Sequence, residues 1–390
     1  MSDSTVILNA HLIGRKATTL YQIELEAAIV CAIAPMESAQ EPDAHKTVID
    51  VAGDWISQGA VDLQINGALG LPFPDLRSVH FEQLQSICDL LWQQGVDGFC
   101  PTIVTTSLEN FHGSLAAIRD FQLQQKKNNT ATIIGAHLEG PFLNPTKRGA
   151  HPAEFLQPLT LDAVKRVVDD FADVISIMTL APEIGEDSGV IEWLCDCNIT
   201  VSLGHSLATA QQANKAFSQG ATMVTHAFNA MPGLHHRDPG LLGVALTDDR
   251  VFCGFIADGQ HICPTMLDLL LRSGRGTAEK VMNRLFLVSD ALSPLGLPDG
   301  KYPWDSREID VINGTARLAD GTLSGTTLPL IEGAQNLLKW GLCEVEEAIA
   351  LVTQAPRQAL NISGLEVGSP SQLLQWKDED DRGSWTRLAI

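Results

Sequence analysis

The alternation of hydrophobic and polar positions changes character near residue 59. Before it, short β-type patterns bounded by polar residues, Gly or Pro predict a small β unit, with strands at 5–9, 21–25, 28–33 and 47–51. After it, short apolar runs alternate with longer segments of helical periodicity. Eight such runs follow one another, at residues 59–63, 98–106, 132–140, 174–183, 201–205, 222–226, 253–259 and 285–290.

Eight strands that alternate with helices over roughly 300 residues predict a (β/α)8 barrel of the TIM type. We assign residues 59–359 to this barrel. The tail from about Gly364 again has β-type patterns, at 371–376 and 385–390. The two ends of the chain, 1–58 and 360–390, are therefore expected to form a small β-sandwich domain together.

Polar residues stand directly after these apolar runs. In a (β/α)8 barrel the active site is built at the carboxyl ends of the strands, so a barrel would bring such residues to one mouth. The residues in this position are His137, Glu139, Glu183, His205, His226, Asp258 and Asp290.

The composition limits which binding partners and which cellular compartment we expect for this protein. A formal charge of -21 opposes a general role in binding nucleic acid or anionic membranes, so a phosphorylated substrate would need a local positive cluster. The eight cysteines form no C-x-x-C pair and follow no secretory leader, which predicts reduced thiols in a cytoplasmic protein. The most apolar short run, 27–36, is shorter than the about 20 residues of a membrane span, so no membrane anchor is expected.

Three of the strand-end residues suit a catalytic metal site. Glu139, His205 and His226 would supply one carboxylate and two imidazoles to Zn or Fe and leave a position open for water. A single histidine after a strand is more often part of the hydrogen-bonded scaffold, and the joint placement of the three favours the metal. Asp290 could act as a general base beside such an ion, or cap the helix that follows it.

Six segments carry a resemblance to a known family. They resemble the N-acetylglucosamine-6-phosphate deacetylases of the amidohydrolase superfamily, in the family's order across residues 50–360. The H-L-E-G-P-F and T-H-x-F-N-A-M motifs are the most specific. The segments are residues 137–151, 204–206, 225–232, 237–240, 258–261 and 289–291.

The resemblance implies a metal-dependent hydrolase that removes the acetyl group from N-acetylglucosamine 6-phosphate. Glu139, His205 and His226 would hold one divalent ion, zinc first, with Fe, Mn or Co as alternatives. Asp290 would be the general base and acid, and His151 would bind the acetamide oxygen. In the family the enzyme is a homodimer, and the residue that matches Arg237 reaches the phosphate from the neighbouring subunit; the resemblance implies both for this chain. The substrate-binding residues would be Gln64, Ala150, His151, Asn229, Ala230, Arg237, His261, Leu323, Ser324, Gly325 and Thr326, the last four in a late loop.

The first predicted strand departs from the superfamily. Its usual H-x-H is replaced by Gln64-Ile65-Asn66, and amides are poor substitutes for imidazole at a transition metal. This favours one tightly held ion, with a second, weakly bound ion left open. The two amides could either contact the metal through water or form a hydrogen-bonded bridge at the barrel mouth.

The sequence leaves several alternatives open. Arg237 follows two histidines and could be a phosphate ligand or a solvated loop residue, and the same holds for the pair Lys147-Arg148. The substrate could be another N-acyl sugar phosphate, such as N-acetylgalactosamine 6-phosphate. A catalytically silent amidohydrolase-like scaffold is the alternative outside enzymes.

Overall fold

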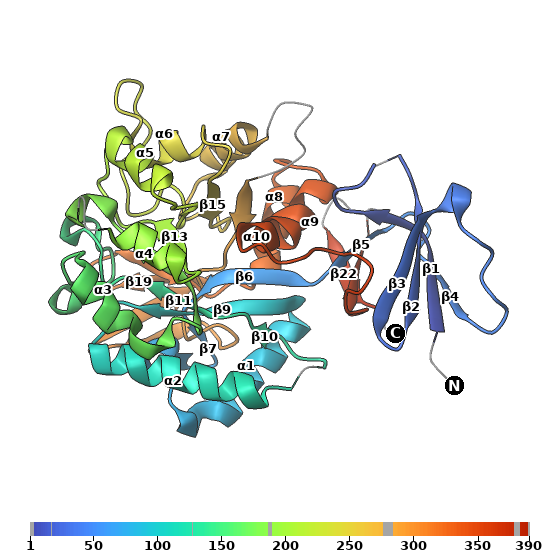
Figure 1. Ribbon diagram of the computed structural model, residues 1–390, viewed down its shortest axis with the longest axis horizontal. Coiled ribbons are helices and arrows are strands. Elements are labelled where there is room, and N and C mark those ends of the chain that lie inside the picture. Colours follow the sequence, from blue (N-terminus) through green and yellow to red (C-terminus); the bar gives the residue numbers. More distant parts are fainter. Residues whose placement is uncertain are drawn as a thin grey trace.

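The computed structural model describes residues 4–16, 18–126, 128–185, 189–275, 284–377 and 383–388. Two bodies are visible in Figure 1: a large barrel with a ring of helices, and a smaller sheet that holds the N-terminal strands. All eight predicted barrel strands are present, and the predicted (β/α)8 fold is confirmed. Within the described residues, no helix combines the length and the apolarity needed to cross a membrane.

The barrel strands lie parallel, each beside the next along the chain. The sheet closes where β16 meets β6, because Asp290 N donates to Gln64 O at 2.9 Å and Asn66 N donates to Ala291 O at 2.7 Å. The strands are β6 (Ala60–Ile65), β9 (Val96–Val104), β11 (Ala136–Glu139), β12 (Ile175–Leu180), β13 (Thr200–Leu203), β14 (Met223–Val224), β15 (Phe252–Phe255) and β16 (Leu285–Leu287), with β10 (Thr132–Ile133) as an extra pairing on β9.

Helices cover the outside of the barrel (Figure 1). Their apolar faces pack with the outward side chains of the strands in one large buried cluster, which is the main hydrophobic core. The helices are α1 (Phe81–Gln93), α2 (Leu108–Gln124), α3 (Leu161–Val168), α4 (Val190–Asp196), α5 (Ala210–Ser218), α6 (Gly240–Ala245), α7 (Pro264–Gly274), α8 (Leu330–Lys339), α9 (Val345–Val352) and α10 (Gln354–Ala359).

The small sheet combines both ends of the chain. Strand β21 pairs with β5, so the C-terminal segment completes the N-terminal unit, and residues 389–390 of the predicted last strand lie outside the described residues. The first half of β1 pairs with β4 and its second half with β5. The strands are β1 (Ser4–Leu12), β2 (Tyr21–Glu26), β3 (Ile29–Pro35), β4 (Thr47–Asp50), β5 (Trp55–Gln58), β21 (Leu373–Lys377) and β22 (Ser384–Arg387).

A four-stranded antiparallel sheet follows β16, and none of the sequence patterns described above predicts it. Its last strand contains the segment expected as a late substrate loop, so that expectation was wrong in its local structure. Asn313 and Gly314 connect two of its strands with φ angles of 49° and 75°, which is the pair of positive values that an Asn-Gly hairpin turn requires. The strands are β17 (Gly300–Trp304), β18 (Arg307–Ile312), β19 (Thr315–Leu318) and β20 (Leu323–Thr326).

Candidate metal centre and active site

Four strand ends place acidic and imidazole side chains at the barrel mouth. Glu139 is the last residue of β11, while His205, His226 and Asp290 follow β13, β14 and β16. The last three have positive φ angles of 48°, 29° and 47°. Non-glycine residues rarely adopt this backbone conformation, which costs about 1–3 kcal/mol and is typical of functional sites. All four side chains are buried.

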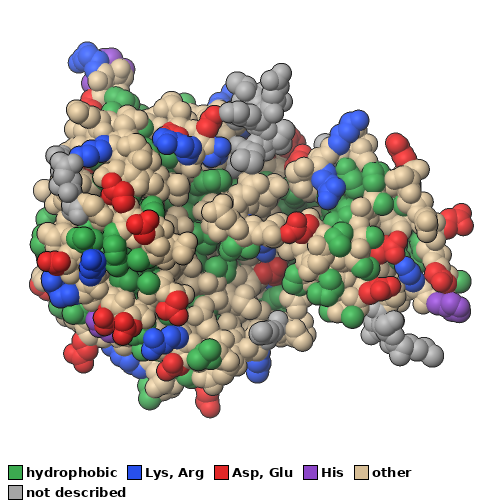
Figure 2. Space-filling model, in the orientation of Figure 1, with side chains coloured by type: hydrophobic (Ala, Val, Ile, Leu, Met, Phe, Trp, Pro, Cys, Tyr) green, Lys and Arg blue, Asp and Glu red, His purple; other side chains and the backbone are tan. Residues whose placement is uncertain are grey.

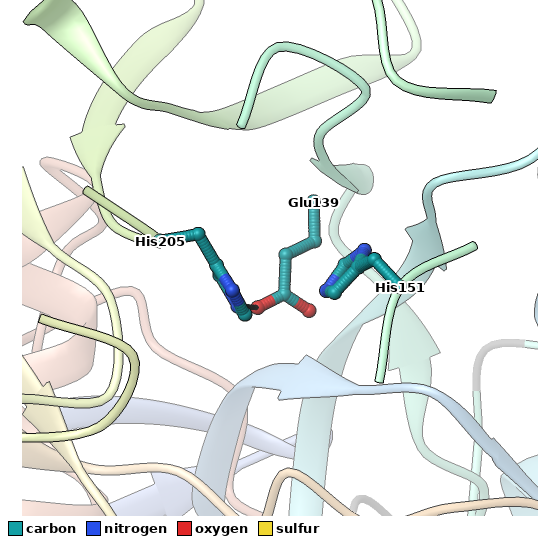
Figure 3. A group of neighbouring side chains, drawn as sticks. All are labelled: Glu139, His151 and His205. Atoms are coloured by element: carbon teal, nitrogen blue, oxygen red, sulfur yellow. Dashed lines mark hydrogen bonds and ion pairs between the residues drawn. The ribbon is translucent and has the colours of Figure 1, made fainter. Parts of the chain in front are cut away.

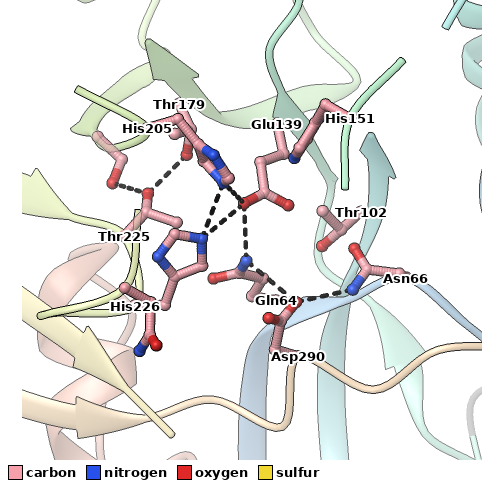
Figure 4. A network of polar contacts seen from close by, with 12 residues as sticks. Gln64, Asn66, Thr102, Glu139, His151, Thr179, His205, Thr225, His226 and Asp290 are labelled. Carbon is pink, nitrogen blue, oxygen red and sulfur yellow. Dashed lines mark hydrogen bonds and ion pairs between the residues drawn. The ribbon is translucent and has the colours of Figure 1, made fainter. Parts of the chain in front are cut away.

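Three donor atoms converge on one point (Figure 4). Glu139 Oε1 lies 3.1 Å from His205 Nε2 and 3.0 Å from His226 Nε2, and the two Nε2 atoms are 3.0 Å apart. Ligands on a tetrahedral zinc ion with bonds of 2.0–2.1 Å lie about 3.3 Å from one another, so a small outward movement would accommodate the ion. One carboxylate and two imidazoles also match the ligand types of a catalytic site. These residues therefore fit a divalent metal.

A second grouping includes His151. The donor atoms of Glu139, His151 and His205 all lie within 4.8 Å of one another, and a ring nitrogen of His151 is turned toward the carboxylate (Figure 3). The two possible triads share Glu139 and His205 and differ in the third ligand. His226 Nε2 lies 3.0 Å from both Glu139 Oε1 and His205 Nε2, which favours His226 as the third ligand.

The loop that carries His151 is held by two arginines. Arg148 Nη1 donates to the carbonyl of His151 at 2.7 Å. Arg307, the first residue of β18, donates from Nη2 to the carbonyl of Ala150 at 2.6 Å. The four-stranded antiparallel sheet, which contains β18, therefore helps to position His151 over the barrel mouth.

Asp290 is held from one side by the two amides of the first strand. Its Oδ1 accepts hydrogen bonds from Asn66 Nδ2 at 2.7 Å and from Gln64 Nε2 at 3.2 Å. Gln64 Nε2 also donates to Glu139 Oε1 at 3.1 Å. The amides thus form the hydrogen-bonded bridge between the two carboxylates, and they leave Asp290 Oδ2 available for other partners.

Burial and neighbouring charges shift the pKa values of the titratable groups at the site in different directions. Burial, together with repulsion from Glu139, raises the pKa of Asp290 to about 6. Burial also opposes ionisation of Glu139, but hydrogen bonds from His205 and His226 outweigh it and hold the pKa of Glu139 well below its ordinary value. Burial lowers the pKa of His151 to about 3, so its ring is neutral near pH 7. A carboxyl group that titrates near neutrality is suited to accept and return a proton.

A cavity of about 630 Å³ opens over this cluster. It contains four acidic side chains, and Lys147 is its one Lys or Arg among the described residues. Most of the predicted site residues line it. They are Glu139, Ala150, His151, His205, His226, Asn229, Ala230, His261, Asp290, Leu323, Ser324 and Gly325.

Three predicted substrate-binding residues do not line this cavity. Gln64 lies behind the carboxylates, and Thr326 is buried, where its hydroxyl donates to Ser289 O at 2.7 Å. Arg237 is exposed on the loop between β14 and α6, and its Nη1 lies 3.0 Å from His236 Nε2. Within this one chain, Gln64 and Thr326 therefore support the site without lining its cavity, and Arg237 lies outside the cavity.

Three strand-end residues expected at the mouth support the scaffold instead. His137 lies deeper in the barrel, 2.9 Å from Leu63 O and 2.7 Å from Thr179 Oγ1. Glu183 accepts hydrogen bonds from the Ser206 hydroxyl and from two other donors. Asp258 Oδ2 lies 2.7 Å from His261 Nδ1 and so orients a cavity residue.

The cavity also has walls that the sequence patterns did not identify. Asn66 was considered for its place in the first strand, but not as a lining residue. Thr105 and Thr106 follow β9 in the same way as the named residues follow their strands, so the strand-end rule could have found them. Further lining residues include Pro72, Asp75, Asn110, Phe155 and Trp304.

Several known proteins are similar to this chain over most of its length. No family model matches the chain. N-acetylglucosamine-6-phosphate deacetylase from Bos taurus is 37% identical over 322 residues, 80% of this chain and 76% of the relative. The enzyme from Homo sapiens is 35% identical over the same length and shares. N-acetylgalactosamine-6-phosphate deacetylase from Escherichia coli O157:H7 is 30% identical over 346 residues, 88% of this chain and 86% of the relative.

Solved structures cover nearly the whole chain. The N-acetylglucosamine-6-phosphate deacetylase from Pasteurella multocida has a TM-score of 0.81 at 27% identity and covers 99% of this chain and 100% of its own. The Thermotoga maritima enzyme has a TM-score of 0.79 at 27% identity, with 97% and 96% covered. Together with the relatives, this shows that the chain belongs to the N-acetylglucosamine-6-phosphate deacetylase family.

Proposed function

We propose that this protein hydrolyses the acetamide of N-acetylglucosamine 6-phosphate to glucosamine 6-phosphate and acetate. The observation that carries the proposal is the convergence of Glu139, His205 and His226 within 3.1 Å of one another, beside the carboxyl group of Asp290 in one cavity. Family membership adds the substrate, because the relatives named above act on amino-sugar phosphates.

One divalent ion would be held by Glu139, His205 and His226. We propose zinc, with Fe, Mn or Co as alternatives that suit the same ligands. When bound, such an ion makes water a strong nucleophile at neutral pH and polarises a carbonyl group.

Side chains of the protein would then transfer the protons and stabilise the developing negative charge. Asp290 would accept a proton from the attacking water and return it to the nitrogen of the leaving amine. His151 would donate a hydrogen bond to the oxygen of the acetamide as negative charge develops there, and such a donor is commonly worth about 3 kcal/mol. Ala150, Asn229, Ala230 and His261, with residues 323–325, would surround the sugar and its phosphate.

A comparison of substrates tests this proposal. We expect release of acetate from N-acetylglucosamine 6-phosphate with kcat/KM at least about tenfold above that for unphosphorylated N-acetylglucosamine, because the phosphate contributes charged hydrogen bonds. N-acetylgalactosamine 6-phosphate belongs in the same assay, since one relative acts on it. A higher kcat/KM for N-acetylgalactosamine 6-phosphate would identify that sugar phosphate as the preferred substrate instead. The absence of acetate release from every sugar phosphate, with zinc bound, would favour the silent scaffold.

We further propose a homodimer in which Arg237 reaches the phosphate in the neighbouring subunit. Lys147 is the one Lys or Arg among the described residues of the cavity, so a phosphate dianion would be poorly neutralised within one chain. Arg237 lies on the loop above α5 that projects from the barrel, and Figure 2 shows basic and histidine side chains gathered at its tip. A planar guanidinium on such a loop is suited to bidentate capture of phosphate.

Complementation between two impaired variants tests the shared site. Arg237→Ala should raise KM by about 10–100-fold, because it removes a charged hydrogen bond to the phosphate. In a mixed dimer with Asp290→Asn, one site would have Asp290 from the first chain and Arg237 from the second. Co-expression of the two variants should therefore restore roughly a quarter of the wild-type activity at low substrate concentration. Activity no higher than the average of the two separate variants would contradict a site completed across the interface.

A further inference from the structure

Thr105 contacts the inner ring nitrogen of His151 with two groups. Its hydroxyl Oγ1 lies 2.9 Å from His151 Nδ1, and its backbone N–H points at the same nitrogen at 3.3 Å. Both residues are buried. The hydroxyl is also 3.3 Å from the carbonyl of Glu139, so its shorter contact is the one to the imidazole.

The close approach of Thr105 depends on the glycine of the H-L-E-G motif. Gly140 has a φ of 89°, and a Cβ atom there would lie 2.2 Å from Thr105 Oγ1. Any larger residue would displace the hydroxyl from its position. The hydroxyl therefore occupies space that the motif leaves free.

These contacts determine which ring nitrogen of His151 carries the proton. A backbone N–H can only donate, so Nδ1 must accept and cannot itself be protonated. The proton of the neutral ring then lies on Nε2, the nitrogen that faces the metal cluster. A nitrogen with a proton has no lone pair for a metal, but it can donate a hydrogen bond.

His205 has the opposite arrangement. Its Nδ1 lies 2.8 Å from the carbonyl of Lys147, and a carbonyl can only accept. The proton of His205 is therefore on Nδ1, and its Nε2 presents a lone pair to the site. A hydrogen bond of this kind behind a histidine is typical of metal ligands. The two imidazoles face the same point in opposite tautomers.

We propose that Thr105 is a positioning residue that fixes His151 as an Nε2–H donor and keeps it out of the metal's ligands. This inference rests on the proposed function and deepens it. It decides between the two triads, because Glu139 and His205 must then take His226 as the third ligand. It also explains how an imidazole within reach of the ion serves the acetamide oxygen instead.

Nuclear magnetic resonance of the ring nitrogens tests the tautomer directly. Zinc-loaded protein labelled with [15N]histidine is used, and the His151 signals are assigned by their loss in His151→Asn. We expect the proton on Nε2 of His151. A proton on Nδ1 would overturn the proposal. Since the measurement needs no turnover, it can be read even if the protein fails to release acetate, which would sink the proposed function alone.

Kinetics with matched variants test the role of the hydroxyl. Thr105→Val keeps the shape of the side chain but removes its donor, and we expect kcat to fall about tenfold at nearly constant KM. Thr105→Ser keeps the donor and should stay within about threefold of wild type. Both variants and His151→Asn should retain zinc as the wild type does. Equal kcat values for the Val and Ser variants, or loss of zinc from His151→Asn, would contradict the assignment.

Discussion

Asp290→Asn is expected to lower kcat on N-acetylglucosamine 6-phosphate by on the order of 10²–10⁴-fold, the range in which general acid and base groups contribute. The amide has nearly the same shape as the carboxyl group, and its oxygen can still accept the hydrogen bonds from Asn66 and Gln64. It cannot take the proton of water or return it to the amine. Initial rates of acetate release at saturating substrate measure the effect.

The zinc content of Asp290→Asn shows whether the substitution removes a proton-transfer group or a metal ligand. Asp290 does not share the short contacts that join Glu139, His205 and His226, so Asp290→Asn should retain zinc as the wild type does. Asn66→Asp is a useful second variant, because it removes a donor from Asp290 Oδ1 without touching the metal cluster. Loss of zinc from Asp290→Asn would mean that Asp290 is a ligand and that its assignment as the base is wrong.

Removal of any one of the three proposed ligands should abolish both zinc binding and turnover. Glu139→Ala, His205→Ala and His226→Ala each leave two protein ligands, fewer than the three that catalytic zinc sites usually have. Zinc should fall from about one equivalent per chain to a small fraction, and acetate release should fall to the background rate. Elemental analysis after zinc loading and gel filtration measures the first quantity, and the substrate assay measures the second.

His261→Asn is the matched control for the ligand variants. His261 lines the same cavity, but its partner is the carboxylate of Asp258 rather than the metal cluster. This variant should keep zinc and lose only part of its affinity for the sugar phosphate. A zinc content as low as that of the ligand variants would indicate general damage to the barrel mouth. Retention of zinc in His226→Ala would show that the third ligand has been misassigned.

The barrel and the strand-end residues can be predicted because each depends on a local pattern. An apolar run of β type marks a barrel strand, and the polar residue that ends it is expected to face the mouth. Applied to the sequence alone, this rule assigns Glu139, His205, His226 and Asp290 to the ends of four separate strands. It fails for His137 and Glu183, because a polar side chain in such a position can also bond within the scaffold. His137 contacts strands β6 and β12, and Glu183 accepts a hydrogen bond from the loop residue Ser206.

The remaining features depend on contacts between distant segments. The hydrogen bonds of Thr105 to His151 join residues 46 positions apart, and those of Gln64 to Asp290 join residues 226 apart. No local pattern reports such a pairing, so the tautomer of His151 and the support of Asp290 become evident only in the folded chain. The four-stranded sheet is different, because its Asn313-Gly314 turn is a local hairpin signal that was open to prediction from the sequence.

The position of the ion is the most direct test of the proposed site. Crystals of the zinc-loaded protein, measured on both sides of the zinc absorption edge, give an anomalous difference map that locates the metal without reference to activity. We predict one peak per chain, about 2.0–2.2 Å from a carboxylate oxygen of Glu139 and from Nε2 of His205 and of His226. A peak bonded to His151 in place of His226, or a fully loaded crystal with no peak at this cluster, would contradict the proposed site.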